Sequence, residues 1–328
     1  MTKTNQQKVK DFLINGVIIV MFILVIYTGF TSDNFFTKNN FMNILMNMSS
    51  RLVIALGIAG CVITAGCDLS AGRMIGFGAC ISGMLLQRMD YSGKFFPDMQ
   101  PLNVFVVALI AMLVCAAFGT VTGFFIAYLN VPPFIATLAM MEIVYGIGLI
   151  VTNATPLGGY VEQYTNVSNG KFLGINYLIW IAIIVAAITW FIFNMTRHGK
   201  YMYAIGGNPQ AAEVAGVPVK ATLILIYMKA AAMYGLAGFM LGAKAGGASV
   251  QTGYGYEMEA IAACTIGGVS VTGGRGKVSS AIIGVAVFEL LKVALQYLGM
   301  NANAQYIAIG VVIFIAISLD IRKYIARK

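Results

Sequence analysis

The sequence predicts an all-α polytopic membrane protein with about ten transmembrane or re-entrant helices. The first observation behind this prediction is the composition. Of the 328 residues, 59% are hydrophobic and only 10% are charged, whereas soluble domains carry about 25% charged residues. The second observation is the recurrence of apolar runs long enough, or nearly so, to cross a bilayer.

These runs lie near residues 12–30, 42–64, 102–129, 133–152, 175–195, 220–243, 277–298 and 303–320. Two shorter runs, near 72–87 and 256–272, are interrupted by glycines and complete the count. The longest predicted loop, 152–176, is too short for a soluble domain, so we expect one transmembrane domain over residues 1–328. The first apolar run is expected to be a membrane helix and not a cleaved signal, because no small-residue cleavage site follows it.

The basic net charge of +9 does not indicate nucleic-acid binding. Lysines and arginines lie at the edges of the apolar runs, where they anchor loops on the inner side of a membrane. Placing both termini in the cytoplasm puts twelve of these residues inside and five outside. We therefore expect a multi-pass protein of the bacterial plasma membrane with both ends inside and the loop at 196–218 in the cytoplasm.

Motifs for enzymatic chemistry are missing from the sequence. The five cysteines lie singly in apolar runs, which predicts neither disulfides nor a metal site. The single histidine, His198, lies in a basic loop. The stretch before Lys277 resembles a phosphate-binding loop, but Val271 and Val278 stand where that motif needs glycine and serine or threonine. We expect no bound cofactor and no ATP site on this chain.

The polar segment 196–218, which lies between two apolar runs, is predicted to contain a short helix with capping residues at both ends. Asn208 is a typical N-cap and Pro209 suits the first helical position. Gly216 fits the left-handed position after the helix, and Pro218 prevents its continuation. Two turns of helix are unstable alone in water, so the predicted helix, 208–216, needs a partner surface.

A polar break follows the second apolar run, at Gly66-Cys67-Asp68-Leu69-Ser70-Ala71-Gly72-Arg73. Irregular backbone at membrane depth is tolerated where it is buried in protein or lines a cavity. Asp68 and Ser70 either contact a polar solute or fix the break, with Asp68 as an N-cap and Arg73 reaching toward the membrane surface. Both interpretations are open at this point.

A second glycine-interrupted segment runs from Gly255 through Tyr256-Glu257-Met258-Glu259 to Gly276. One broken segment in each half of a transporter points to a translocation path. Close packing of helices by small residues is the alternative, and we weigh the two equally.

Four ionisable residues lie inside predicted spans, where charge is costly. Glu289 and Lys292 are three apart, so we expect them to pair with each other. Lys229 and Glu142 have no local partner. We expect Lys229 to pair with a carboxylate from another helix (Glu289 before Glu142 or Glu257), to be deprotonated, or to face a wet cavity or the solute path.

Five motifs occur in an order that carries a family resemblance. They are G-x-D-L-S-x-G (66–72), N-V-P-P-F-I-A-T-L (130–138), G-K-Y-M-Y-A-I-G-G-N-P-Q-A-A-E-V-A-G-V (199–217), Y-E-M-E-A-I-A-A-C (256–264) and G-G-V-S-V-T-G-G-R-G (267–276). Together they resemble the permease subunit of bacterial ATP-binding-cassette sugar importers of the ribose/galactose type, above all its galactose/methyl-galactoside members. The resemblance covers nearly the whole chain.

The resemblance implies the ABC importer permease fold and a set of partners: a second copy of this chain, a cytoplasmic ATPase that binds ATP and magnesium, an extracytoplasmic sugar-binding protein and membrane lipids. It also gives the 208–216 helix a role, the coupling helix that docks on the ATPase. The residues that match the coupling motif are Arg197, Gly199, Gly206, Asn208, Pro209, Glu213 and Gly216.

The resemblance also assigns the two breaks. Five residues are expected to line the translocation path, some from the family motifs and some from the sequence itself: Asp68, Ser70, Glu257, Ser270 and Lys229. Glycines that match the helix breaks are Gly66, Gly72, Gly267, Gly268, Gly273 and Gly274.

The family pattern usually has small or apolar residues at Lys229 and Glu142, and lacks the charges of Arg275 and Lys277. These departures leave the sugar open between galactose or a methyl galactoside, ribose, and another sugar-like solute. A proton-driven secondary transporter is the alternative from another class, with Glu142, Glu257 or Glu289 carrying the proton.

Overall fold

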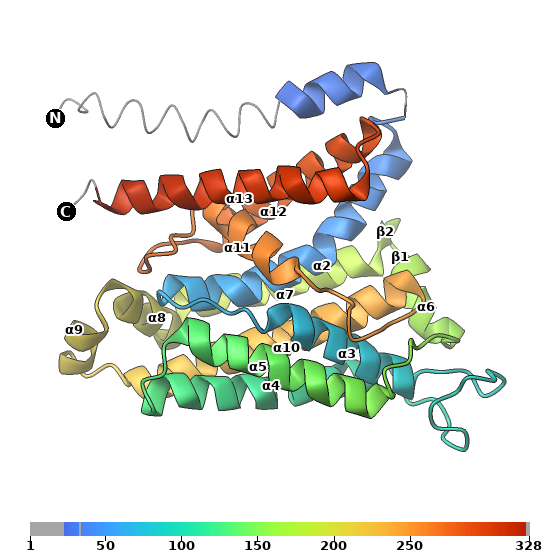
Figure 1. The fold of residues 1–328 in the computed structure, drawn as a ribbon, viewed down its shortest axis with the longest axis horizontal. Helices are drawn as coiled ribbons and strands as arrows, with labels where there is room; N and C mark the ends of the chain where they lie inside the picture. The colour runs from blue at the N-terminus through green and yellow to red at the C-terminus, as the bar shows by residue number, and fades with distance from the viewer. Residues whose placement is uncertain (1–22, 33, 326–328) are drawn as a thin grey trace.

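A computed structural model describes residues 23–32 and 34–325 of the chain, which fold almost entirely into helices (Figure 1). Residues 23–31 form the first described helix. The elements that follow are α2 (Lys38–Ile63), α3 (Ala71–Leu85), α4 (Val104–Tyr128), α5 (Pro133–Thr152), α6 (Glu162–Asn169), β1 (Lys171–Phe172), β2 (Ile175–Asn176), α7 (Tyr177–Met195), α8 (Arg197–Gly207), α9 (Pro209–Val214), α10 (Val219–Ala245), α11 (Tyr256–Gly267), α12 (Val278–Tyr297) and α13 (Ala302–Ile325).

Six of the described helices are long and apolar enough to cross a membrane: α2, α4, α5, α7, α10 and α12. Each coincides with a predicted apolar run to within a few residues. The two glycine-interrupted runs form the shorter helices α3 and α11, and the run at 303–320 lies within α13. The run at 12–30 falls mostly outside the described residues. The count of about ten membrane segments therefore stays a prediction.

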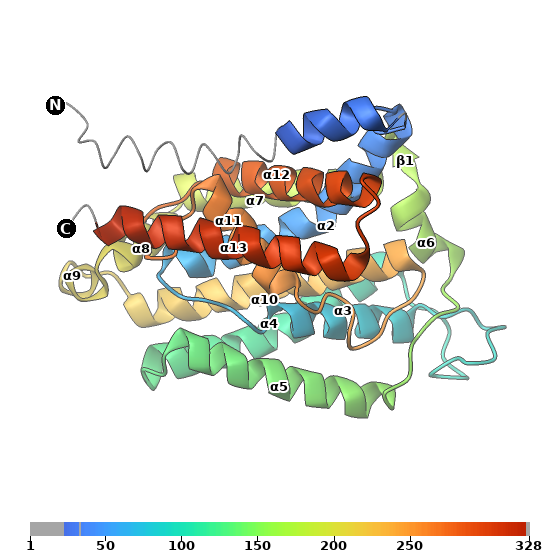
Figure 2. The same cartoon turned by 45° about the horizontal axis from the view of Figure 1, so that its top comes forward.

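The centre of the molecule is α10, which packs against α4, α3 and α2 (Figure 2). Small residues allow these helices to approach closely. A Cβ added at Gly119 of α4 would collide with the Tyr227 carbonyl of α10, and one at Gly235 of α10 with the Ala111 carbonyl of α4. Close approach of this kind drives helix association in lipid, where burial of apolar surface contributes little.

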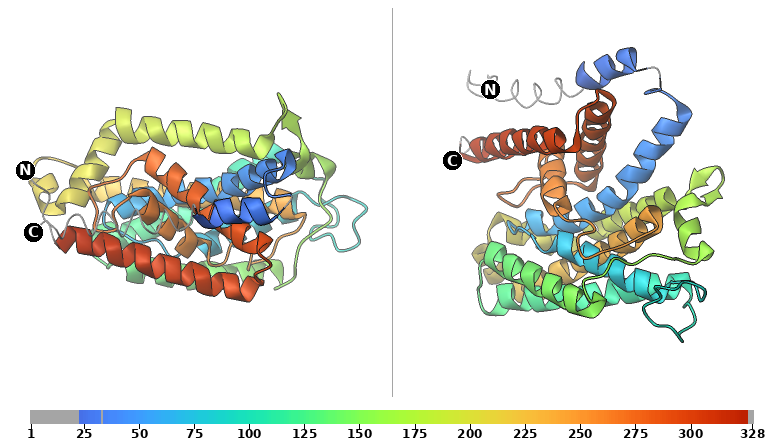
Figure 3. Two further views of the ribbon diagram at one scale, coloured as in Figure 1. Left: turned by 90° about the horizontal axis from the view of Figure 1, so that it is seen from above. Right: turned by 45° about the vertical axis from the view of Figure 1, so that its right-hand side comes forward.

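A second group of helices, α11, α12 and α13, lies to one side of this bundle (Figure 3). The helix that joins the two groups most extensively is α2, which packs against α10 on one side and against α11 and α12 on the other. The contact between α11 and α12 is close: a Cβ at Gly267 would collide with the Ser280 carbonyl, and one at Gly284 with the Ala263 carbonyl.

The two ends of the molecule are formed by different elements (Figure 1). At one end of the molecule lie α8 and α9 and also, farther off, the last described turn of α13. At the opposite end, the predicted loop 152–176 folds into α6 and the β1–β2 hairpin, in which Lys171 pairs with Asn176. The structure has a helix, α9 (Pro209–Val214), within the range 208–216 where a short helix was expected. The sequence analysis did not predict α8, a helix of 11 residues that Thr196 caps through the Gly199 amide at 3.2 Å.

Replacing Gly284 with alanine is expected to destabilise the protein by about 1–3 kcal/mol, because an overpacked helix contact forces backbone to move. The matched control is Gly310→Ala in α13, where an added Cβ meets nothing within 4 Å. Thermal unfolding of both variants in detergent, followed by size-exclusion chromatography, measures the difference. Equal melting temperatures would contradict the close contact between α11 and α12.

Candidate functional site

The first part of the candidate site is the short helix α9. The Asn208 side chain caps it by accepting a hydrogen bond from the Ala211 amide at 2.9 Å. Gly216 has a φ of 81°, the left-handed conformation expected after the helix. Most of α9 is exposed, and Val214 is 91% exposed while only Ala212 is buried. The helix α9 is therefore preformed by its own cap and is largely exposed to solvent.

Behind α9, the helix α8 touches the end of α2, which precedes the first polar break, and the second polar break through backbone atoms. A Cβ at Gly206 of α8 would collide with the Ile63 carbonyl at the end of α2. A Cβ at Gly273 would come within 2.6 Å of the Gly206 carbonyl. The Gly274 amide donates to the Ile63 carbonyl at 2.8 Å, and the Tyr203 hydroxyl of α8 donates to the Gly276 carbonyl at 2.8 Å. Three glycine-marked segments, far apart in sequence, therefore meet in one place.

The other residues matched to the coupling motif lie around this contact. Arg197 and Glu213 are exposed, which leaves both free to face a partner. Gly199 is buried in the turn from α7 into α8, where a Cβ would collide with the Phe193 carbonyl. The sharp α7–α8 turn thus depends on glycine at that position.

The first break is held by hydrogen bonds to Asp68, whose side chain is 1% exposed. Its Oδ1 accepts from the Ser70 amide at 3.0 Å and from the Ser70 hydroxyl at 2.6 Å. Its Oδ2 accepts from the Tyr234 hydroxyl of α10 at 3.1 Å. The N-cap residue of α3 is Ser70 and not Asp68, which corrects that interpretation. In this conformation the carboxylate faces protein on all sides, as expected of a residue that fixes the break.

The glycines at the first break allow neighbouring segments to pack closely, and they do not adopt unusual backbone angles. The left-handed residue there is Ala65, with a φ of 58°, and not Gly66. A Cβ at Gly66 would collide with the Tyr227 hydroxyl, and one at Gly72 with Glu257 Oε2 of α11. Glu257 is 5% exposed, and its Oε2 has no hydrogen bond within the described part of the chain. The two breaks therefore also meet at Gly72 and Glu257.

Arg73 contacts aromatic and polar side chains of two other segments. Its guanidinium lies between two aromatic rings, 3.9 Å from the Tyr145 centroid and 4.4 Å from the Tyr254 centroid. Its Nη1 donates to Gln251 Oε1 at 2.8 Å. The rings hold the charge by cation–π attraction, so Arg73 ties α3 to α5 and to the loop before α11.

Of the four glycines matched to the second break, three have positive φ: Gly268 (102°), Gly273 (87°) and Gly274 (71°). Their backbone conformation is one that other residues rarely adopt. Gly267, by contrast, is the last residue of α11 and serves the close packing on α12. Ser270 Oγ lies 2.9 Å from Thr272 Oγ1 within this loop. Irregular backbone thus explains Gly268, Gly273 and Gly274, whereas close packing explains Gly267.

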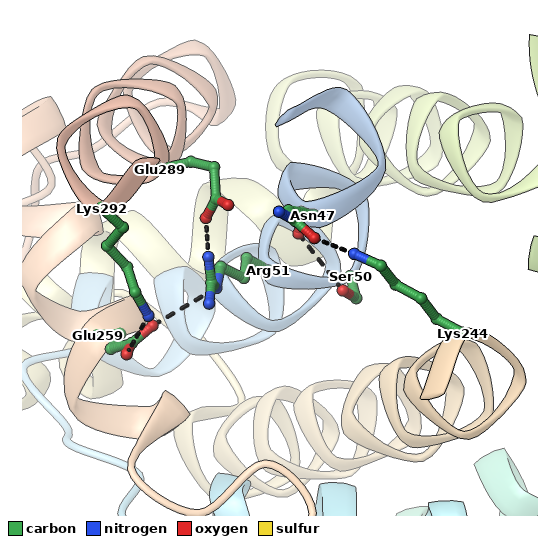
Figure 4. A network of polar contacts seen from close by, with 7 residues as sticks. All are labelled: Asn47, Ser50, Arg51, Lys244, Glu259, Glu289 and Lys292. Carbon is green, nitrogen blue, oxygen red and sulfur yellow. Dashed lines mark hydrogen bonds and ion pairs between the residues drawn. The ribbon is translucent and has the colours of Figure 1, made fainter. Parts of the chain in front are cut away.

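The predicted pairing of Glu289 with Lys292 is wrong. Glu289 pairs with Arg51 of α2, while Lys292 Nζ lies 2.7 Å from Glu259 Oε1 of α11 (Figure 4). Arg51 Nε also lies 3.5 Å from Glu259 Oε2. Although the two α12 residues are one turn apart, one faces α2 and the other α11. The network thus joins three helices instead of stabilising one.

The sequence analysis missed Arg51 and Glu259 as partners. Arg51 lies ten residues into the run 42–64, as deep as Lys229 in its own run, so the same criterion could have singled it out. Glu259 is two residues from Glu257, and residues two apart on a helix point in different directions. Glu257 accordingly faces α3, and Glu259 faces α2 and α12.

The predicted ion pair between Lys229 and Glu289 is also wrong, because Arg51 takes that carboxylate. Among the described residues, no carboxylate lies within ion-pair distance of Lys229, and Glu142 is exposed without an ion pair. Lys229 lines a cavity of about 30 Å³ between α2, α7, α8 and α10, together with Thr189 and His198. That volume holds a water molecule or two.

Comparing the Asn and Leu variants of Asp68 shows whether its hydrogen bonds or its negative charge stabilise the first break. Asp68→Asn keeps an acceptor for Ser70 and a polar partner for Tyr234, so we expect nearly normal expression and stability. Asp68→Leu strands the Ser70 amide and both hydroxyls, at about 1–3 kcal/mol for each buried group left unsatisfied. Expression and melting temperature of both variants test this, with Tyr234→Phe as the control that loses one bond. Equal losses in Asn and Leu would contradict a hydrogen-bonding role.

The stability of the α7–α8 turn is expected to fall in acid. Burial, and secondarily the charge of Lys229, lower the pKa of His198 to about 4, against about 6.5 in the unfolded chain. The unfolded chain therefore binds the proton first, so stability is lost as pH falls from about 6.5 to about 4 and is unaffected above that window. His198→Gln should reduce the drop in melting temperature between about pH 7.5 and about pH 5. An unchanged drop would contradict this environment for His198.

Comparison with known proteins supports one family over nearly the whole chain. The family model described as "Branched-chain amino acid transport system / permease component" matches residues 40–317. The galactose/methyl galactoside import permease protein MglC of Escherichia coli K12 is 40% identical over 320 residues, 95% of each chain. The protein of that name from Haemophilus influenzae is 41% identical over 319 residues, 94% of this chain and 95% of its own length.

A second group of relatives carries another name. The ribose import permease protein RbsC of Escherichia coli K12 is 32% identical over 310 residues, 93% of each chain. No solved structure matches the chain. The matched region includes every element of the candidate site, from α2 through α8 and α9 to the α11–α12 contact. The chain therefore belongs to the transport-system permease family that this model describes.

Proposed function

We propose that this chain is the membrane-spanning permease subunit of an ATP-driven sugar importer, and that its solute is galactose or a methyl galactoside. The observation that carries the proposal is 40% identity with proteins named for that solute over 95% of both chains. An identity that extends from end to end covers the breaks, the coupling motif and the helices between them. Relatives named for ribose are 32% identical, so ribose is the second candidate.

The four departures from the family pattern bear on the choice of sugar. Glu142, Arg275 and Lys277 are exposed, and Lys229 lines a small cavity near His198. None of these residues contacts the buried centre formed by Asp68, Ser70 and Tyr234. This placement supports a solute of the same class as that of the relatives.

The helix α9 would act as the coupling helix, seated on a cytoplasmic ATPase that holds ATP and magnesium. Its exposed apolar residue and its cap support that role. Displacement of α9 would pass through α8 to both breaks, because Gly206 touches Ile63, Gly273 and Gly274 without intervening side chains. The end of the molecule that carries α8 and α9 would then be cytoplasmic, together with the C-terminal end of α13 (Figure 1).

The remaining partners follow from the importer mechanism. A second copy of this chain would complete the path, and an extracytoplasmic binding protein would deliver the sugar to the end that carries α6 and the hairpin. The proton-driven alternative has less support. Glu289 pairs with Arg51, and Glu257 lies buried against Gly72.

The test of the proposal is transport by the assembled complex. The chain is purified with the proteins encoded beside it and reconstituted with ATP in vesicles, and uptake of labelled galactose is measured with unlabelled methyl galactoside or ribose as competitor. ATP-dependent galactose uptake that methyl galactoside suppresses more strongly than ribose does supports the proposal. Uptake by this chain alone, driven by a proton gradient, would contradict it.

Charge reversal at Glu213 is expected to abolish most sugar uptake and leave the melting temperature of the membrane core unchanged. The matched control is Glu162→Arg, which reverses an exposed glutamate in α6 at the opposite end. Asn208→Ala should weaken α9 by roughly 1 kcal/mol through the lost cap, with a partial loss of uptake. If Glu213→Arg retains full uptake and ATPase binding, α9 does not couple transport to ATP.

A further inference from the structure

A polar cavity of about 560 Å³ lies between α2, α10 and α12, at the ends of these helices farthest from α9. Six polar side chains line it, and we refer to it as the amide crevice: Asn40, Asn43, Asn47, Lys244, Gln296 and Tyr297. The volume lies within the range of about 300–1,000 Å³ typical of small-molecule sites. No residue that touches the site described above lines this cavity.

The sequence places these groups on facing stripes. In α2, Asn40, Asn43 and Asn47 follow one another at helical spacing, and Gln296 of α12 lies one turn beyond Lys292. Amides on membrane-spanning helices are costly unless they meet water or a polar partner. Both stripes face the crevice, and Asn43 and Gln296 are exposed, so a polar molecule can reach these amides from outside the protein.

The crevice has unused hydrogen-bonding capacity. Asn40 is committed to structure, because its Nδ2 donates to the Phe35 carbonyl at 2.7 Å. Lys244 donates to Asn47 Oδ1 (Figure 4), which leaves the amide nitrogen of Asn47 available. Within the described part of the chain, the amides of Asn43 and Gln296 have no protein partner. Each amide offers both donors and an acceptor, which matches hydroxyl groups, since a hydroxyl also donates and accepts.

The charge of the crevice narrows the ligand class. Lys244 is the one ionised side chain among its lining residues, and no carboxylate lines it. One turn deeper lies the network of Arg51, Glu259, Glu289 and Lys292, whose two cations and two carboxylates cancel (Figure 4). The single ammonium disfavours metal ions and protonated amines, and the neutral amides that make up most of the polar lining suit the hydroxyl groups of a neutral solute.

We propose that the amide crevice is a monosaccharide-binding subsite within a single protomer, on the side from which the sugar enters. This inference rests on the function proposed above and adds the contact residues. Sugar hydroxyls bond to the side-chain amides of Asn43, Asn47 and Gln296 and to the Lys244 ammonium. The Tyr297 ring, which packs edge-on against Phe35 at 5.3 Å, presents an apolar surface beside them.

The experiment measures protection from chemical labelling in the full transporter. Asn43→Cys and Gln296→Cys are each introduced, and labelling by a membrane-impermeant maleimide is followed with and without D-galactose. Both cysteines should label from the side opposite α9, and galactose should slow labelling at least severalfold. The matched control is Phe36→Cys, an exposed position near the start of α2 that does not line the crevice and should label equally in both conditions.

Kinetics give a second, independent readout. Gln296→Leu should raise the KM for galactose uptake about tenfold, the effect expected for one lost hydrogen bond, with kcat little changed. If the unaltered transporter imports galactose but galactose protects neither cysteine and KM stays constant, the crevice is not a sugar site. If the unaltered complex imports neither galactose nor ribose, the proposed function itself is wrong.

Discussion

The hydrogen bonds to the Asp68 carboxylate are the interaction on which this structure depends. Between α2 and α3 the chain leaves the helical conformation while surrounded by protein at membrane depth, where an unpaired backbone amide is costly. Asp68 accepts hydrogen bonds from the amide and hydroxyl of Ser70, the residue before α3, and from the Tyr234 hydroxyl of α10. Because α10 is the helix around which α2, α3 and α4 pack, this one side chain connects the irregular segment to the centre of the bundle. The close contact of Gly72 with Glu257 then places α11 relative to both.

The sequence was sufficient to predict the spans and the short helix α9, since both depend on local signals. Apolar runs coincide with α4, α5, α7, α10 and α12 to within a few residues, because length and hydropathy alone decide whether a segment crosses lipid. The helix α9 is marked at both ends by Asn208 and Gly216, whose roles are local to the chain. The helix α8 escaped prediction because glycines and charged residues interrupt its apolar pattern, and packing against α2 and the second break stabilises it instead.

The partners of buried charges were not predictable from spacing. Glu289 and Lys292 satisfy the i, i+3 rule, yet each pairs with a residue of another helix. In lipid, an ion pair between two helices neutralises both charges and also adds to helix association, whereas a pair within one helix only neutralises. The direction in which each side chain leaves its helix depends on the packing of α2 between two helical groups. Sequence spacing carries no information about that packing, so Arg51 was not recognised as the partner of two carboxylates.

The contact of Gly206 with Ile63, Gly273 and Gly274 has a mechanical consequence. Side chains that separate two helices can change rotamer, so they absorb small displacements before any force is passed on. Here main-chain atoms meet main-chain atoms, and bonds and planar peptides have no comparable freedom. A shift of α8 by a fraction of an ångström must therefore displace the end of α2 and the loop before α12 together. This contact of α8 with the end of α2 and the loop before α12 is therefore rigid, and we expect these three segments to move at the same time and not one after another.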